Sequence, residues 1–219
     1  MRLRFDGWIA GLGTRSGVRL VVGCWVRSPF GAFGDVMIER EDGERLLLAP
    51  ARQIADFVAA TYAFEEVRVV PVPVPVRVRA AAKGWVVTAP SLDLHLGIGA
   101  RGALGWLLSA VPGPLAARPG WSALVDLPAR LMPGVRTRGR SGAGRREWYG
   151  VRDLRPIVTA RAVLEGAELG PLAPVEPPVR FGFGSVPRNP AVVRVTTTVG
   201  LDGGRSVWAS AFRRPPCDR

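Results

Sequence analysis

Residues 35–48, Asp-Val-Met-Ile-Glu-Arg-Glu-Asp-Gly-Glu-Arg-Leu-Leu-Leu, carry the pattern of two strands joined by a tight turn. Asp42-Gly43 is a strong hairpin signal, because glycine adopts positive φ without steric cost. The segments on either side, 35–40 and 44–48, are apolar enough to lie against a core. The stretch therefore predicts an antiparallel hairpin.

The residues before this hairpin extend it into a meander. Leu3–Ala10 and Val18–Val26 predict two further strands, joined by glycine-rich turn residues 11–17. Glycines in that turn have some likeness to a dinucleotide-binding loop, but such a loop needs a helix after it. The β-branched residues that follow favour a strand, so we interpret the turn as a hairpin connection.

A helix and an edge strand are predicted next. Ile54, Phe57, Val58 and Tyr62 recur at helical spacing, which predicts a helix from about Ala51 to Tyr62. Residues 66–79 predict a long strand that contains prolines at 71, 73 and 75. Prolines two apart remove hydrogen-bond donors from one edge only, so this strand should lie at a sheet edge.

Later residues alternate between strand-like and helical patterns. Leu92, Leu94 and Leu96 alternate with Asp93 and His95, which should place the leucines in the core and the only histidine outside. Residues 101–132 have helical spacing and predict a helical insertion. Further strands are expected at 146–150, 156–165, 180–186, 192–199 and 205–212.

These patterns predict a β-rich α+β fold. We expect one domain over residues 1–212, in which an antiparallel meander closes into a barrel-like sheet with a few short capping helices. Residues 213–219 are expected to form a frayed tail.

Composition limits the compartment and the partners. The 219 residues carry a net charge of +12, which favours nucleic acid, acidic membrane surfaces or anionic small molecules. The sequence predicts no targeting or transmembrane segment, and hence a cytoplasmic protein. Cys24 and Cys217 fit neither a disulfide framework nor a metal site, and we expect no cofactor.

Residues 130–161 hold nine arginines and only two acids. Within them, the glycine-rich stretch 139–144 precedes Arg145, Arg146, Glu147, Trp148 and Tyr149. This stretch resembles a phosphate-binding loop but lacks its lysine and hydroxyl. We hypothesise that Arg145 or Arg146 pairs with an anionic group and that Trp148 or Tyr149 stacks on an apolar one. A solvated surface loop is the alternative.

Two short stretches resemble the acetoacetate decarboxylase family. Residues 146–150, Arg-Glu-Trp-Tyr-Gly, resemble the family's R-E-x-[YFW]-G segment, and residues 33–38 loosely resemble its acidic strand. The resemblance implies a β-rich, barrel-like sheet around a closed pocket. The family's Schiff-base lysine follows this motif, where this chain has Val-Arg-Asp-Leu at 151–154. The only lysine, Lys83, lies on a predicted exposed turn, so the resemblance implies a lysine-free relative.

Three functions remain open at this point. The first is binding of a small anionic or amphipathic organic molecule. The second is a lysine-free decarboxylase-like enzyme, a cyclase or an isomerase, with Glu147 or Asp153 as general acid or base. The third is nucleic-acid binding through residues 130–161, with arginines on phosphates and Trp148 and Tyr149 stacked on bases.

Overall fold

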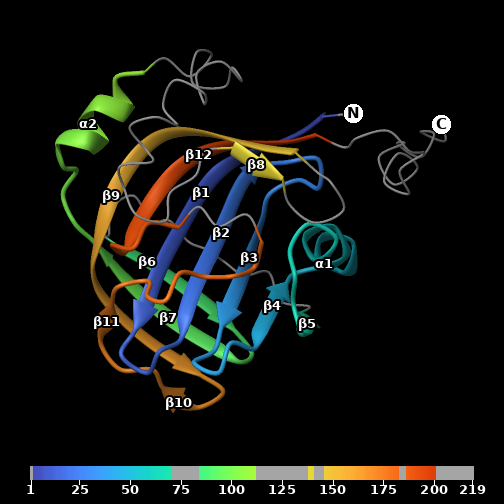
Figure 1. The fold of residues 1–219 in the computed structure, drawn as a ribbon, viewed down its shortest axis with the longest axis vertical. Helices are drawn as coiled ribbons and strands as arrows, with labels where there is room; N and C mark the ends of the chain where they lie inside the picture. Colours follow the sequence, from blue (N-terminus) through green and yellow to red (C-terminus); the bar gives the residue numbers. More distant parts are fainter. Residues whose placement is uncertain (1, 71–83, 112–137, 141–145, 183–185, 201–219) are drawn as a thin grey trace, which may run out of the picture.

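A computed structural model describes residues 2–70, 84–111, 138–140, 146–182 and 186–200 (Figure 1). Their strands form a twelve-stranded, mostly antiparallel sheet whose main path runs β5-β4-β3-β2-β1-β12-β9-β7-β6. The other three strands, β8 (Arg138–Arg140), β10 (Ala167–Glu168) and β11 (Leu172–Ala173), pair with β9 or β1. The β-rich α+β expectation is confirmed at this level.

The predicted meander is present. It consists of β1 (Arg2–Thr14), β2 (Arg19–Arg27), β3 (Phe33–Glu39) and β4 (Arg45–Ala49), each antiparallel to the next. At the Asp42-Gly43 turn, Gly43 has φ +92°, and the Arg40 N–H donates to the Glu44 carbonyl at 2.8 Å. The turn chemistry read from the sequence therefore sets this hairpin.

Helix α1 (Arg52–Ala59) interrupts the antiparallel pattern. It carries the chain back over the sheet, so that β5 (Glu66–Val69) pairs with β4 in parallel. The helix agrees with the prediction but is shorter at both ends. β5 lies at one end of the sheet, as expected for an edge strand, whereas prolines 71, 73 and 75 lie outside the described residues.

Strand β9 (Arg146–Leu164) is one continuous strand of 19 residues, where the sequence predicted two. Its first part pairs with β12 (Ala191–Gly200) and its second part with β7 (Leu92–Ile98). Pro156, which has no N–H to donate, lies where the first ladder ends and the second begins. The proline marks an exchange of partners rather than the end of a strand.

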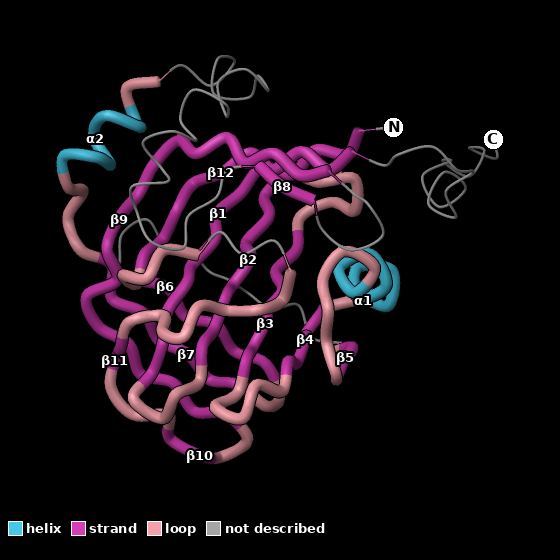
Figure 2. Tube along the Cα trace, in the orientation of Figure 1, coloured by secondary structure: helices cyan, strands magenta, loops and turns pink. Residues whose placement is uncertain are grey.

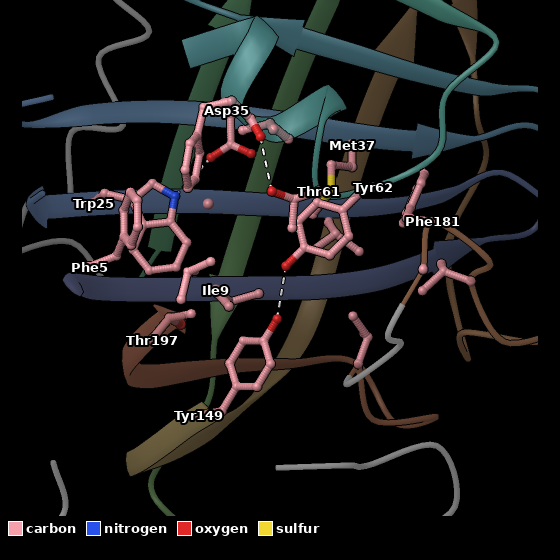
Figure 3. Close-up of a pocket in the computed structure, with 18 of the residues that line it drawn as sticks. Phe5, Ile9, Trp25, Asp35, Met37, Thr61, Tyr62, Tyr149, Phe181 and Thr197 are labelled. Carbon is pink, nitrogen blue, oxygen red and sulfur yellow. Dashed lines mark hydrogen bonds between the residues drawn. The ribbon is translucent and has the colours of Figure 1, made fainter. Parts of the chain in front are cut away.

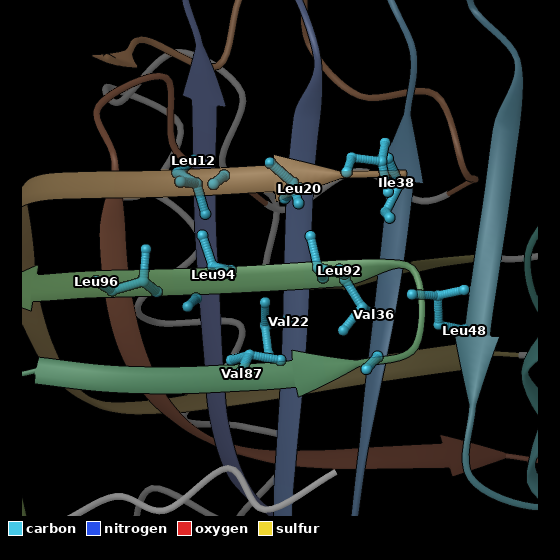
Figure 4. Packing of buried hydrophobic residues seen from close by; sticks show 14 of the residues in the cluster. Leu12, Leu20, Val22, Val36, Ile38, Leu48, Val87, Leu92, Leu94 and Leu96 are labelled. Carbon is cyan, nitrogen blue, oxygen red and sulfur yellow. The ribbon is translucent and has the colours of Figure 1, made fainter. Parts of the chain in front are cut away.

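This exchange folds the sheet over itself. Strand β6 (Gly84–Ala89) and β7 cross one face of β1–β4, and aliphatic side chains fill the space between them (Figure 4). Leu92, Leu94 and Leu96 point into this core, and His95 is exposed beside Asp93, so the predicted alternation is confirmed.

The expected barrel closure is wrong. A barrel needs hydrogen bonds between its first and last strands, but the described ladders leave β5 and β6 as the two ends of the sheet path. Packed leucine and valine side chains, rather than a closing ladder, hold the two layers together.

The opposite face of β1–β4 is covered by α1 and by irregular chain. The segment after β11 crosses in front of β1, β2 and β3 (Figure 2). Arg180 on this segment bonds to Glu39 of β3, which anchors it to the sheet. Residues 180–182 are therefore not the strand that the sequence predicted. The Arg180 backbone bonds to the Glu39 and Arg45 side chains, and the Phe181 carbonyl accepts from Ala63 in the connection after α1.

The helical region is seen only in part. Helix α2 (Ala103–Ser109) packs on β9, and a Cβ at Gly105 would lie 2.2 Å from the Leu154 carbonyl oxygen. The rest of the predicted insertion from 112 to 132, and the tail 213–219, lie outside the described residues. Within the described ranges, neither helix is long and apolar enough to cross a membrane.

Candidate functional site

A cavity of about 80 Å³ lies between the second face of the sheet, α1 and the segment that follows β11 (Figure 3). Strand alternation sends every second residue of β1, β2 and β3 toward it. Most of its walls are apolar or aromatic. The lining residues are Phe5, Ile9, Val21, Gly23, Trp25, Phe33, Asp35, Met37, Phe57, Val58, Thr61, Tyr62, Tyr149, Val179, Phe181, Gly182, Val186, Thr197 and Val199.

Aromatic rings form the wall at one end of the cavity. The Phe5 and Trp25 rings meet edge to face with centroids 5.7 Å apart, and Phe5 also lies 5.4 Å from Phe57. Trp25 is 6.4 Å from Phe33. These four residues come from β1, β2, β3 and α1, so the helix and the sheet build this wall together.

Asp35 is the acidic residue of this wall. It is 3% exposed, and its Oδ1 accepts a hydrogen bond of 2.9 Å from Trp25 Nε1. Burial raises the pKa of this carboxyl to about 6, although the Trp25 hydrogen bond acts in the opposite direction. Its other oxygen, Oδ2, has no hydrogen-bond partner among the described residues, and the carboxyl lines the cavity.

Three oxygens form a triangle at the other end of the cavity. The Tyr62 and Tyr149 hydroxyls lie 2.8 and 2.6 Å from Glu147 Oε2, and 2.9 Å from each other. Figure 3 shows the two hydroxyls pointing toward one another. Burial, with added repulsion from Tyr149 and Glu147, raises the pKa of Tyr62 well above its usual value. Tyr62 therefore keeps its hydroxyl proton at neutral pH and donates a hydrogen bond to Glu147.

Glu147 bonds to both tyrosine hydroxyls and is not itself among the described lining residues. It is 1% exposed, and its Oε1 has no hydrogen-bond partner in the described part of the chain. The end of α1 holds Tyr62 in place, since the Tyr62 N–H donates to the Val58 carbonyl at 2.9 Å. Helix α1 and β9, which are far apart in sequence, thus bring their polar groups together.

The predicted residues separate along β9. Glu147 and Tyr149 share the face toward the cavity, whereas Trp148 points to the opposite face, where the Arg2 guanidinium lies 5.6 Å from its ring. For Arg146 only the backbone, within β9, is described, and Arg145 lies outside the described residues. The expected pairing of an arginine with an anion stays a prediction.

Asp153 lies apart from the cavity. Arg101 donates two hydrogen bonds of 2.8 Å to its carboxylate, and Arg155 adds a third at 3.3 Å. Burial raises the pKa of Asp153, but these bonds and charges outweigh it and leave the pKa below its usual value. Arg101 also stacks on Trp106 at 4.7 Å, so this ion pair ties α2 to β9.

Sequence reasoning missed Asp35, Trp25 and Tyr62 as site residues. A usable signal did exist for Asp35. It alternates with Phe33 and Met37 on the inward-facing side of a predicted strand, where an acid is unusual. Nothing local pointed to Tyr62, because only the fold brings the end of α1 to β9.

The described residues contain no cluster of three or more histidine, cysteine, aspartate or glutamate side chains that could hold a metal ion. Lys83 lies outside them. No family model, no curated protein and no solved structure matches this chain.

Proposed function

We propose that this chain binds a small amphipathic organic molecule in the cavity between α1 and the sheet. The observation that carries the proposal is the composition of the cavity wall: aromatic side chains surround a few polar groups that converge from different elements. Ligand sites combine apolar walls with a few polar groups in the same way. Asp35 and the two tyrosine hydroxyls would fix the orientation of the ligand.

The volume limits the ligand. An apolar cavity of about 150 Å³ admits benzene, and this one measures about 80 Å³. A ligand that leaves the protein unchanged is therefore smaller than benzene, such as a short branched alkyl group with one polar substituent. The polar groups of the described lining are a carboxyl, phenols and hydroxyls, with no arginine. This composition favours an amphipathic ligand over an anionic one.

A cavity-filling substitution tests the proposal. Val21→Phe places a ring in the cavity, and Val26→Phe, on the exposed end of the same strand, is the matched control. We expect small amphipathic compounds to raise the melting temperature of the wild type and of Val26→Phe, and not that of Val21→Phe. Equal responses in all three proteins would place the binding site elsewhere.

The Glu147–tyrosine triangle favours a second candidate, which is an enzyme that moves a proton on its bound ligand. A ligand C–H proton would pass to the Tyr149 oxygen while the Tyr149 hydroxyl proton passes to Glu147 Oε2 over 2.6 Å. An isomerase or cyclase needs a step of this kind. Schiff-base decarboxylation would need Lys83, which lies outside the described residues, so the triangle gives it no support.

Deuterium exchange separates the enzyme from the binding protein. Ligands found by melting-temperature screening would be incubated in D₂O and followed by proton NMR. Proton transfer predicts loss of one C–H signal with the wild type and none with Glu147→Gln. If a ligand binds and keeps every C–H signal, the binding function stands and proton transfer on that ligand is excluded.

A further inference from the structure

Asp35 differs from Glu39 and Asp153, two of the three other buried carboxylates among the described residues. Glu39, four residues further along the same strand, bonds to Arg19 at 2.9 Å and to Arg180 at 3.0 Å. Asp153 is held by Arg101 and Arg155. Among the described residues, no cation contacts Asp35, although the sequence has 30 lysines and arginines against 18 acids.

The surroundings of Asp35 would suit a cation. Burying an unpaired carboxylate costs free energy unless a positive partner or hydrogen-bond donors compensate. Asp35 receives one such donor, from Trp25 to its Oδ1, and the Asp35 carboxyl lines the cavity. The Trp25, Phe5 and Phe33 rings stand beside it, and aromatic rings attract ammonium groups through their negative faces.

We propose that the cavity binds a small organic ammonium ion, with its positive nitrogen at Asp35 Oδ2 and its methyl or alkyl groups against the aromatic wall. This inference rests on the proposed binding function and specifies the class of its ligand. At the other end, the Tyr62 and Tyr149 oxygens donate their hydrogens to Glu147 and would accept a hydrogen bond from a hydroxyl group on the same ligand.

The other titratable groups near Asp35 leave it as the partner for an ammonium ion. Burial raises the pKa of the Cys24 thiol to about 11, so this thiol stays neutral. The Tyr62 phenol stays neutral as well. Glu147 is not among the described lining residues, and its Oε2 already accepts from both tyrosine hydroxyls. Thr197 Oγ1 also lacks a hydrogen-bond partner and Thr197 lines the cavity, but a hydroxyl carries no charge, so among the described lining residues Asp35 is the one carboxyl that an ammonium ion can pair with.

A matched set of ligands tests this inference. tert-Butylammonium, tert-butanol and isobutyrate have similar size and differ in charge, and isothermal titration calorimetry measures their affinities. At pH 7.5 we expect wild type to prefer the ammonium ion at least tenfold over the alcohol. Asp35→Asn should lose at least tenfold in ammonium affinity and keep its affinity for the alcohol within twofold.

The pH dependence gives a second readout on the unmodified protein. Lowering the pH from 7.5 to 5 protonates Asp35, so ammonium affinity should fall about tenfold while alcohol affinity stays constant. Asp35→Asn should abolish this dependence. Equal binding of ammonium and alcohol, or preference for isobutyrate, would overturn the ammonium inference and leave the binding function in place. If none of the three compounds binds even at millimolar concentration, this inference is overturned; a failure of Val21→Phe to alter any screening response would overturn the binding function as well.

Discussion

Gly23 lies directly opposite Asp35 across the β2–β3 ladder, and the Asp35 carboxylate occupies the space that a side chain at Gly23 would fill. A Cβ at Gly23 would be 2.3 Å from Asp35 Oδ1 and 2.7 Å from Trp25 Nε1. The Asp35–Trp25 hydrogen bond therefore exists because position 23 has no side chain.

The first prediction concerns this contact. Gly23→Ala should displace the Asp35 or Trp25 side chain and lower the free energy of unfolding by about 1–3 kcal/mol, the range of overpacked sites. Urea unfolding measures the change. In an Asp35→Ala background the same substitution should cost less, because the opposing carboxylate is gone. Equal costs in the two backgrounds would mean that Gly23 and Asp35 are not coupled.

The second prediction follows from the pKa of Asp35, about 6 in the folded protein against 3.8 ordinarily. The folded state binds the proton more tightly than the unfolded state, so this residue makes stability decrease as pH rises from about 4 to 6. Asp35→Asn should therefore stabilise the protein at pH 7 by up to about 3 kcal/mol, and by little near pH 4.

Unfolding free energies at pH 4, 5, 6 and 7 check this, with Asp56→Asn on the exposed face of α1 as control. A variant that is less stable than the wild type at pH 7 would show that Asp35 has a positive partner that the described residues do not include.

Local chemistry explains why much of the fold is predictable. The Asp42-Gly43 turn and the alternation around His95 need only neighbours in sequence, and both appear as expected. The folding over of the sheet depends instead on distant pairings. The partners of β9 lie 35 to 54 residues later in β12, from Pro156–Ala191 to Arg146–Gly200, and 59 to 72 residues earlier in β7, from Ile157–Ile98 to Leu164–Leu92. Barrel closure was predicted by the same local reasoning, and it failed because closure depends on two distant edges.

The candidate site, too, could be predicted from local sequence only in part. The Arg-Glu-Trp-Tyr-Gly stretch drew attention to Tyr149, which lines the cavity, and to Glu147, which accepts a hydrogen bond from the Tyr149 hydroxyl. Trp148 could be separated from them by strand alternation once residues 146–150 are taken as a strand. Tyr62 lies 85 residues before Glu147 in the chain, and no local pattern predicts the hydrogen bond between them.

The third prediction concerns the Glu147–tyrosine triangle. Tyr149→Phe removes a hydrogen bond from the buried Glu147 carboxylate and should lower the unfolding free energy by about 1–3 kcal/mol. In a Glu147→Gln background the loss should be smaller, because a neutral amide depends less on the phenol. Thermal or urea unfolding of the four proteins gives the coupling. Additive losses would show that the two side chains act independently.

The last prediction concerns the buried ion pair that anchors the segment over the cavity. Arg19 and Glu39 are 3% and 0% exposed, whereas Arg180, the second partner of Glu39, is 67% exposed. Arg19→Met should remove about 3–5 kcal/mol of stability, because it leaves a buried carboxylate with only a solvent-facing arginine. Arg180→Met should cost less, since Arg19 remains and exposed charges contribute little.

Arg180→Met should leave the segment over the cavity in place. The Arg180 backbone N–H still donates to Glu39 when its side chain is replaced, so the segment that carries Phe181 stays on the sheet. The double variant Arg19→Met/Glu39→Leu should recover most of the stability lost in Arg19→Met, because no buried charge remains. If Arg19→Met were no less stable than Arg180→Met in urea, the buried Arg19–Glu39 contact would contribute no more to the anchor than the exposed Arg180 does.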